Sequence, residues 1–140
     1  NLPATFARMS ATSENAARLA EAGVAVSIVS FDDPTHQAQL ARQVAGNAVA
    51  AGMSMSKALM AITSAPAAIY GMNDMGVLAP GARADVVAWD GDPLEITSAP
   101  QSIYIDGKKQ SLESRQTKLR DRYRDLAPKD RPQAYRKAPR

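Results

Sequence analysis

The segment from Gly23 to Asp33, GVAVSIVSFDD, constrains the fold more than any other part of the sequence. Its apolar residues are mostly valine and isoleucine and are almost continuous, which predicts a strand from Val24 to Ser30 that is buried on both faces, as in a parallel sheet. Asp32 and Asp33 follow directly. Two carboxylates would therefore lie at the carboxyl end of a buried strand, which is where βα proteins place their functional residues.

A strand of this kind needs neighbours on both sides, because backbone amide and carbonyl groups cannot be left unpaired away from water. Apolar periodicity predicts a helix before it, with Ala16, Leu19 and Ala20 on its inner face, and another after it from about Ala38 to Ala51. Neither supplies a strand. Either the strand pairs with short strands later in the chain, forming a small α+β domain, or its neighbours lie outside these 140 residues. We favour the second interpretation.

The sequence predicts four successive regions: residues 1–75, residues 76–112, residues 113–126 and residues 127–140. The first is mainly helical around the one long strand, with Ser10, Thr12 or Ser13 as the N-cap of its first helix and Ser54 or Ser56 as the N-cap of its third. The second holds short strands, including a hairpin over SIYIDGKKQ with Asp106-Gly107 as its two-residue turn. The third is a helix expected to dock through an apolar stripe of Leu119, Tyr123 and Leu126. The fourth is a basic, proline-containing tail without periodicity, expected to be mobile.

Charge is distributed unevenly along the chain. Of 17 basic and 14 acidic residues, twelve basic and four acidic ones lie between Gly107 and Arg140. A basic tail can bind nucleic acid or an acidic membrane surface. We expect neither partner, because such a tail is more often a solvated helix with a ragged terminus and no recognised nucleic-acid module accompanies the charge. No apolar run approaches 18 residues, so we expect no transmembrane helix. If the tail did bind RNA, that binding would be sensitive to salt.

The candidate metal ligands are few. The chain has no cysteine, which excludes disulfides and thiolate metal sites, and one histidine, His36. Asp32, Asp33 and His36 offer oxygen donors and one imidazole, whereas a catalytic zinc normally takes three protein ligands. The two aspartates also suit a helix N-cap and a turn before Pro34, and His36 suits an exposed loop. The chain opens on Asn1 without a signal-like segment, so we expect a piece of a longer product and assign no compartment.

Three motifs carry a resemblance to a known family. They are VSFDD, ITSAPA at Ile62 to Ala67, and the pattern G-x-L-x-P-G-x-x-A-D-V-V-x-W-x-G-D-P-L at Gly76 to Leu94. In order and spacing they resemble the C-terminal part of the metal-dependent amidohydrolase superfamily, especially its imidazolonepropionase-like and Xaa-Pro dipeptidase-like branch. The resemblance extends from about Asn1 to Leu126.

The resemblance implies an α/β fold, the C-terminal end of a (β/α)8 TIM-like barrel. Residues 1–75 would supply the last helices and the final strand, residues 76–112 the returning strands of a small β-sandwich domain, and residues 113–126 a C-terminal helix. It also implies that Asp32 binds a metal and shuttles a proton, with Asp33 as the alternative register. The complete enzyme would use zinc or another divalent metal to hydrolyse C–N bonds with activated water.

The resemblance further implies partners that this chain lacks. The family's His-x-His pair, its bridging lysine or carboxylate and its two later histidines have no match here. We therefore expect no metal on the isolated chain, no activity, and a need for the N-terminal remainder of the barrel, in the same chain or a separate subunit. A small amide or peptide substrate and a homo-oligomer are also expected. The alternative is a non-enzymatic interaction module derived from a truncated amidohydrolase.

Overall fold

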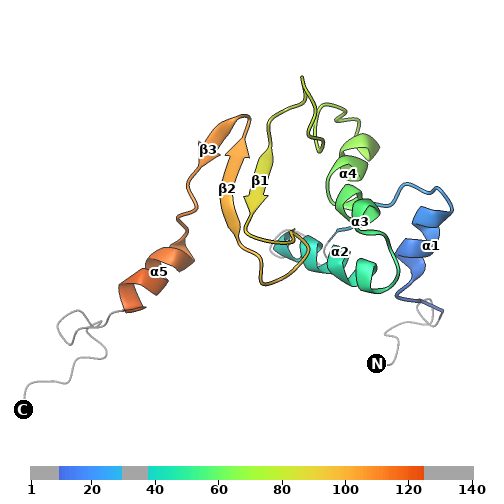
Figure 1. Ribbon diagram of the computed structural model, residues 1–140, viewed down its shortest axis with the longest axis horizontal. Helices are drawn as coiled ribbons and strands as arrows, with labels where there is room; N and C mark the ends of the chain where they lie inside the picture. The colour runs from blue at the N-terminus through green and yellow to red at the C-terminus, as the bar shows by residue number, and fades with distance from the viewer. Residues whose placement is uncertain (1–9, 30–37, 125–140) are drawn as a thin grey trace, which may run out of the picture. The chain divides into compact units, whose positions relative to one another are not determined.

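The computed structural model describes residues 10–29 and 38–124. The chain divides into two compact units, residues 1–110 and residues 111–140, each described here by itself. The elements are α1 (Asn15–Glu21), the 3-10 helix η2 (Ala38–Leu40), α2 (Ala41–Ala50), α3 (Met55–Ala61), α4 (Ser64–Ile69), β1 (Val86–Trp89), β2 (Pro100–Ile105), β3 (Lys108–Gln110) and, in the second unit, α5 (Arg115–Arg124) (Figure 1). No helix within the described ranges is long and apolar enough to cross a membrane.

Small side chains form the core of the first unit. Helix α2 contacts α1 and α3, and α3 contacts α4. The buried cluster consists of Ala17, Ala20, Ala45, Ala48, Ala58 and Ala61 from these helices, together with Met53 and Leu94. Alanine buries little apolar area, and close packing of helix backbones replaces the usual large side chains. The helices predicted from periodicity are thus confirmed, and their contact faces are mostly alanine. The predicted inner face of α1 is wrong at Leu19, which is 39% exposed; Ala17, which is buried together with Ala20, takes the inward position instead.

Helix α3 begins as the sequence predicts. Ser54 has extended backbone angles, and its Oγ accepts a hydrogen bond from the Lys57 amide at 3.3 Å. The predicted cap of α1 is wrong, because Glu14 occupies the N-cap position and makes no capping bond with its side chain. Thr12 instead accepts a bond from the Glu14 amide, 3.3 Å away, in the turn before the helix.

Removal of the α3 cap gives a first testable prediction. Ser54→Ala should lower the free energy of unfolding by about 1 kcal/mol, because one amide of the first turn loses its acceptor. Ser56→Ala is the matched control, since Ser56 is exposed inside the same helix and alanine is the better helix former. Urea unfolding followed by circular dichroism measures both variants. Equal destabilisation by the two substitutions would contradict the capping role.

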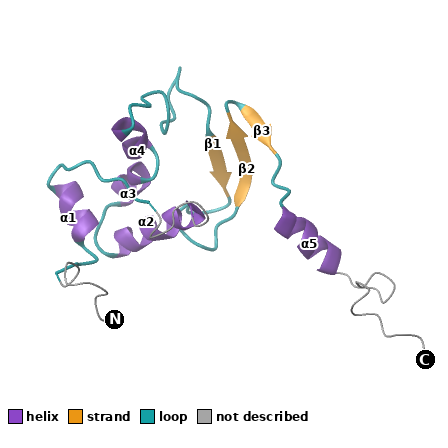
Figure 2. Cartoon of the chain, turned by 180° about the vertical axis from the view of Figure 1, so that it is seen from behind, coloured by secondary structure: helices purple, strands orange, loops and turns teal. Residues whose placement is uncertain are grey.

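The three strands form one antiparallel sheet in the order β1-β2-β3 (Figure 2). Val86 pairs with Tyr104, Ile103 pairs with Gln110, and the register shifts between Ala88 and Trp89. The predicted hairpin turn is confirmed, because Asp106 and Gly107 have φ values of 52° and 70°. Two positive φ values are what a type I′ turn requires.

The predicted strand from Val24 to Ser30 is not formed as far as Val29, the last of its residues that the structure describes. The segment does not belong to the sheet, so the less favoured alternative, in which it pairs with the later strands, is wrong for these residues. Val26 and Ile28 pack against the helical core, whereas Val24 and Val29 are 50% and 66% exposed. Burial is one-sided because helices cover one side and no described strand pairs with the segment.

The second unit contains α5 in its described part. Leu119 and Tyr123, two residues of the predicted apolar stripe, are each 40% exposed, and the Arg122 guanidinium lies 5.6 Å from the centre of the Tyr123 ring. The third stripe residue, Leu126, and the tail of residues 127–140 lie outside the described residues. Docking of this helix remains a prediction.

Candidate functional site

The residues that the sequence singles out as metal ligands, Asp32, Asp33 and His36, lie outside the described residues, which resume at Ala38. Before them, the Ile28 amide donates a hydrogen bond to the Ala61 carbonyl at the end of α3, with a distance of 2.9 Å. After them, η2 leads directly into α2. Described elements therefore fix where the carboxylate-bearing segment leaves the helices and where it returns.

The described residues do not make a metal site by themselves. Within residues 10–29 and 38–124 there is no group of three or more histidine, cysteine, aspartate or glutamate side chains that could hold an ion. A catalytic zinc normally takes three such ligands and keeps a fourth position open. The carboxylates of Asp32, Asp33, Asp125 and Asp130 and the imidazole of His36 lie outside these ranges.

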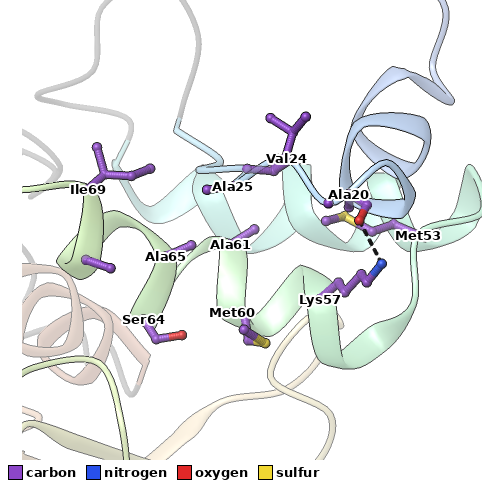
Figure 3. A pocket seen from close by; sticks show the side chains of 13 residues that line it. Ala20, Val24, Ala25, Met53, Lys57, Met60, Ala61, Ser64, Ala65 and Ile69 are labelled. Atoms are coloured by element: carbon purple, nitrogen blue, oxygen red, sulfur yellow. Dashed lines mark hydrogen bonds between the residues drawn. The ribbon is translucent and has the colours of Figure 1, made fainter. Parts of the chain in front are cut away.

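An apolar groove lies between the segment after α1 and helices α3 and α4 (Figure 3). Its volume is about 570 Å³. Its apolar lining includes Ala20, Val24, Ala25, Val26, Met53, Met60, Ala61, Ala65 and Ile69, and Lys57 and Ser64 are the polar side chains among its lining residues. Val24, Met60 and Ile69 are each at least half exposed. Contiguous exposed apolar surface of this kind is typical of a packing interface.

Lys57 has a defined role at the end of this groove. Its Nζ donates a hydrogen bond to the Ala20 carbonyl, 2.8 Å away, near the C-terminal end of α1 (Figure 3). The last carbonyls of a helix lack partners within the helix, and the helix dipole favours a cation there. The sequence pattern does not predict this bond. A charged residue in the otherwise uncharged run MSMSKALM was the available signal.

A second feature that sequence reasoning missed joins α2 to the loop after β1. The Arg42 guanidinium lies 4.1 Å from the centre of the Trp89 ring, and its Nη1 donates to the Pro93 carbonyl at 2.9 Å. Leu94, the next residue of the loop, is 7% exposed and belongs to the helical core. A Cβ added at Gly46 would lie 3.0 Å from the Leu94 carbonyl oxygen, so the helix and loop backbones approach closely.

Comparisons with known proteins point to one family. The model of the amidohydrolase family matches residues 2–119. Amidohydrolase tasK of Hapsidospora irregularis is 38% identical over 80 residues, which make up 56% of this chain and 8% of that protein. The crystal structure of an amidohydrolase from Thermotoga maritima MSB8 matches with a TM-score of 0.69 and 30% identity over 78% of this chain.

The chain spans a small part of these relatives. It covers 28% of the Thermotoga chain, and the mixed helices and small antiparallel sheet described above are similar to that portion of a larger structure. The family model covers most of the sequence, including the segment with Asp32 and the loop that meets Arg42. These 140 residues therefore belong to the amidohydrolase family.

Proposed function

We propose that the chain is the C-terminal part of a metal-dependent hydrolase that cleaves C–N bonds in amides, peptides or cyclic amides, and that it is inactive alone. The observation that carries this proposal is the family match over residues 2–119. In support, Asp32 follows closely after the segment Val24–Val29, as a ligand at the end of a final barrel strand would. The barrel itself is part of the proposal.

Asp32 would act through its carboxylate. Zinc or another divalent metal, when bound in the complete enzyme, supplies Lewis-acid activation of water. A nearby cation keeps a carboxylate ionised, so Asp32 could accept a proton on a carboxylate oxygen. It would then return that proton to the departing amine nitrogen, as a general acid does. Asp33 is the alternative residue for this role.

The groove and the segment Val24–Val29 support the proposal that another polypeptide segment packs against this surface. The segment's β-branched residues are partly exposed, and it has no strand beside it within the described residues. The N-terminal remainder of an amidohydrolase, in the same polypeptide or a separate subunit, would cover this surface. The chain's 28% share of the Thermotoga structure is consistent with such a remainder. Formation of a homo-oligomer stays a prediction.

The test compares the purified 140-residue chain with the longest natural polypeptide that contains it, identified by intact mass. The longer polypeptide should hold metal in fixed stoichiometry, hydrolyse small peptides or N-acyl amino acids, lose activity on chelation and regain it with zinc. The isolated chain should neither hold metal in fixed stoichiometry nor hydrolyse these substrates, because it lacks most of the ligands. Tight one-to-one zinc binding by the isolated chain would contradict the proposal.

The second candidate is a non-enzymatic interaction module, and the exposed apolar groove is the observation that favours it. The same mass measurement separates the two. A natural product of 14.9 kDa would favour the module, whereas a mass above about 30 kDa, as a full barrel requires, would favour the enzyme. A His-x-His motif upstream in the same reading frame would also favour the enzyme.

A further inference from the structure

Helix α5 presents a basic face with apolar side chains beside it. No residue of the helix is buried, and Leu119 and Tyr123 are each 40% exposed. Residues three, four and seven positions apart share one face of a helix, so Arg115, Lys118 and Arg122 form a row next to these two apolar side chains. Arg115 is the first residue of the helix, where the partial positive charge of the helix end disfavours a cation. The stability of the helix therefore does not explain this residue.

The start of α5 is held by hydrogen bonds of its own. The Thr117 amide donates to Ser114 Oγ at 3.1 Å, and the Ser114 amide donates to Thr117 Oγ1 at 2.8 Å. These reciprocal bonds satisfy amides that have no partner within the helix. Lys118 already pairs with the Glu113 carboxylate, 3.3 Å away. Because a carboxylate beside the basic row would repel phosphate, this face suits an acidic protein surface better than a nucleic acid.

The loop between β1 and β2 carries the opposite charge around an exposed apolar residue. Ile96 is 71% exposed, and residues 90–99 include no basic side chain. The acidic residues of this loop are all exposed: Asp90, Asp92 and Glu95. The Asp90 carboxylate accepts a hydrogen bond from the Ala99 amide at 2.8 Å, which closes the base of the loop, and Leu94 is buried in the helical core. The loop is therefore a preformed acidic surface.

We propose that α5 of one copy of the chain binds the β1–β2 loop of a second copy, and that two copies exchange this contact to form a dimer. Leu119 and Tyr123 pack on Ile96, and the basic row faces the acidic residues of the loop. Both surfaces are exposed in the single chain. A two-fold pair therefore closes with two identical contacts.

The distribution of charge along the chain supports this pairing. Residues 1–110 contain seven basic and ten acidic residues, whereas residues 111–140 contain ten basic and four acidic ones. Complementary charge steers such surfaces together and fixes their register. The inference does not rest on the proposed hydrolase, because self-association needs neither metal nor substrate.

The experiment measures self-association of the full 140-residue chain by sedimentation velocity over a series of concentrations. The helix variant carries Arg115→Glu together with Arg122→Glu, and the loop variant carries Glu95→Arg. Each variant alone should raise the dissociation constant of the dimer by about tenfold or more, because like charges then face each other in both contacts. High salt should also weaken the unsubstituted dimer, since it screens exposed charges.

Mixing the two variants shows whether the contact joins separate copies. An equimolar mixture should associate more tightly than either variant alone, because each mixed pair keeps one contact between an unchanged helix and an unchanged loop. A contact made within one chain would give no gain on mixing. That result, or an unsubstituted chain that stays monomeric at every concentration, would overturn the proposal.

Matched controls place the same changes of charge elsewhere on exposed residues. Glu21→Arg in α1 matches the loop variant, and Lys108→Glu with Lys109→Glu in β3 matches the helix variant. Both should leave the dissociation constant nearly unchanged, and weakening equal to that of the test variants would also contradict the proposal. Circular dichroism checks folding. If the helix variant does not fold, the loop variant and its control still decide the question.

Discussion

Gly76→Ala is expected to destabilise the first unit by roughly 3 kcal/mol or more. Gly76 has a φ of +75°, and a Cβ added there would lie 2.6 Å from the Thr63 carbonyl oxygen and 2.8 Å from the Ser64 amide nitrogen. The left-handed conformation costs an L-residue about 1–2 kcal/mol, and overpacking adds about 1–3 kcal/mol. The atoms in the way are backbone atoms at the start of α4, so the helix itself would have to shift.

Gly71→Ala separates the cost of the left-handed backbone conformation from the cost of the overlap between the added Cβ and the backbone of Thr63 and Ser64. Gly71 also has a φ of +75°, but a Cβ there would meet nothing within 4 Å. Its substitution should therefore cost only the conformational part, about 1–2 kcal/mol. Urea unfolding of both variants gives the comparison. Equal losses would show that the region around Thr63 relaxes freely and that the close approach at Gly76 has no energetic weight.

The second large effect is expected on hydrolysis and metal binding, on substitution of Asp32. If the proposed function holds, Asp32→Asn is expected to lower the kcat of the complete hydrolase by about 10²–10⁴-fold, because an amide oxygen cannot accept and return a proton as a carboxylate does. Removing a charged ligand should also weaken metal binding. Steady-state hydrolysis, with metal content measured on the same sample, tests both parts. Thermal unfolding shows whether the variant remains folded.

Asp33→Asn is the control for this substitution, since it changes the adjacent carboxylate in the same way. It should retain most of the activity and its metal. If Asp33→Asn abolishes activity and Asp32→Asn does not, the register proposed from the sequence is shifted by one residue. If neither variant affects hydrolysis or metal content, the proposed role for this pair of carboxylates is wrong.

Local patterns predicted the local elements. The apolar period gave the region of α2, Ser54 marked the start of α3, and Asp106-Gly107 marked the hairpin turn, each confirmed by the structure. These features depend on neighbours within a few residues along the chain. The strand predicted from Val24 to Ser30 is not formed as far as Val29. A strand needs a partner strand, and a β-branched sequence alone does not supply one.

The sequence predicted which residue types belong to the candidate site, but it did not predict how distant parts of the chain contact one another. The family motifs identified Asp32 and Asp33, but both lie outside the described residues, so their roles remain predictions. The contact between Arg42 and Pro93 joins residues 51 positions apart. Nothing in the helical pattern around Arg42 or in the turn residues around Pro93 indicates that the two would meet. Only the folded backbone brings them together.

The alanine core of the first unit has a consequence for its response to temperature. The heat-capacity change of unfolding grows with the apolar area that becomes exposed, and it sets the curvature of stability against temperature. A core built mainly from residues such as Ala45 and Ala58, both fully buried, exposes little such area. The free energy of unfolding of this unit should therefore change slowly with temperature on either side of its maximum.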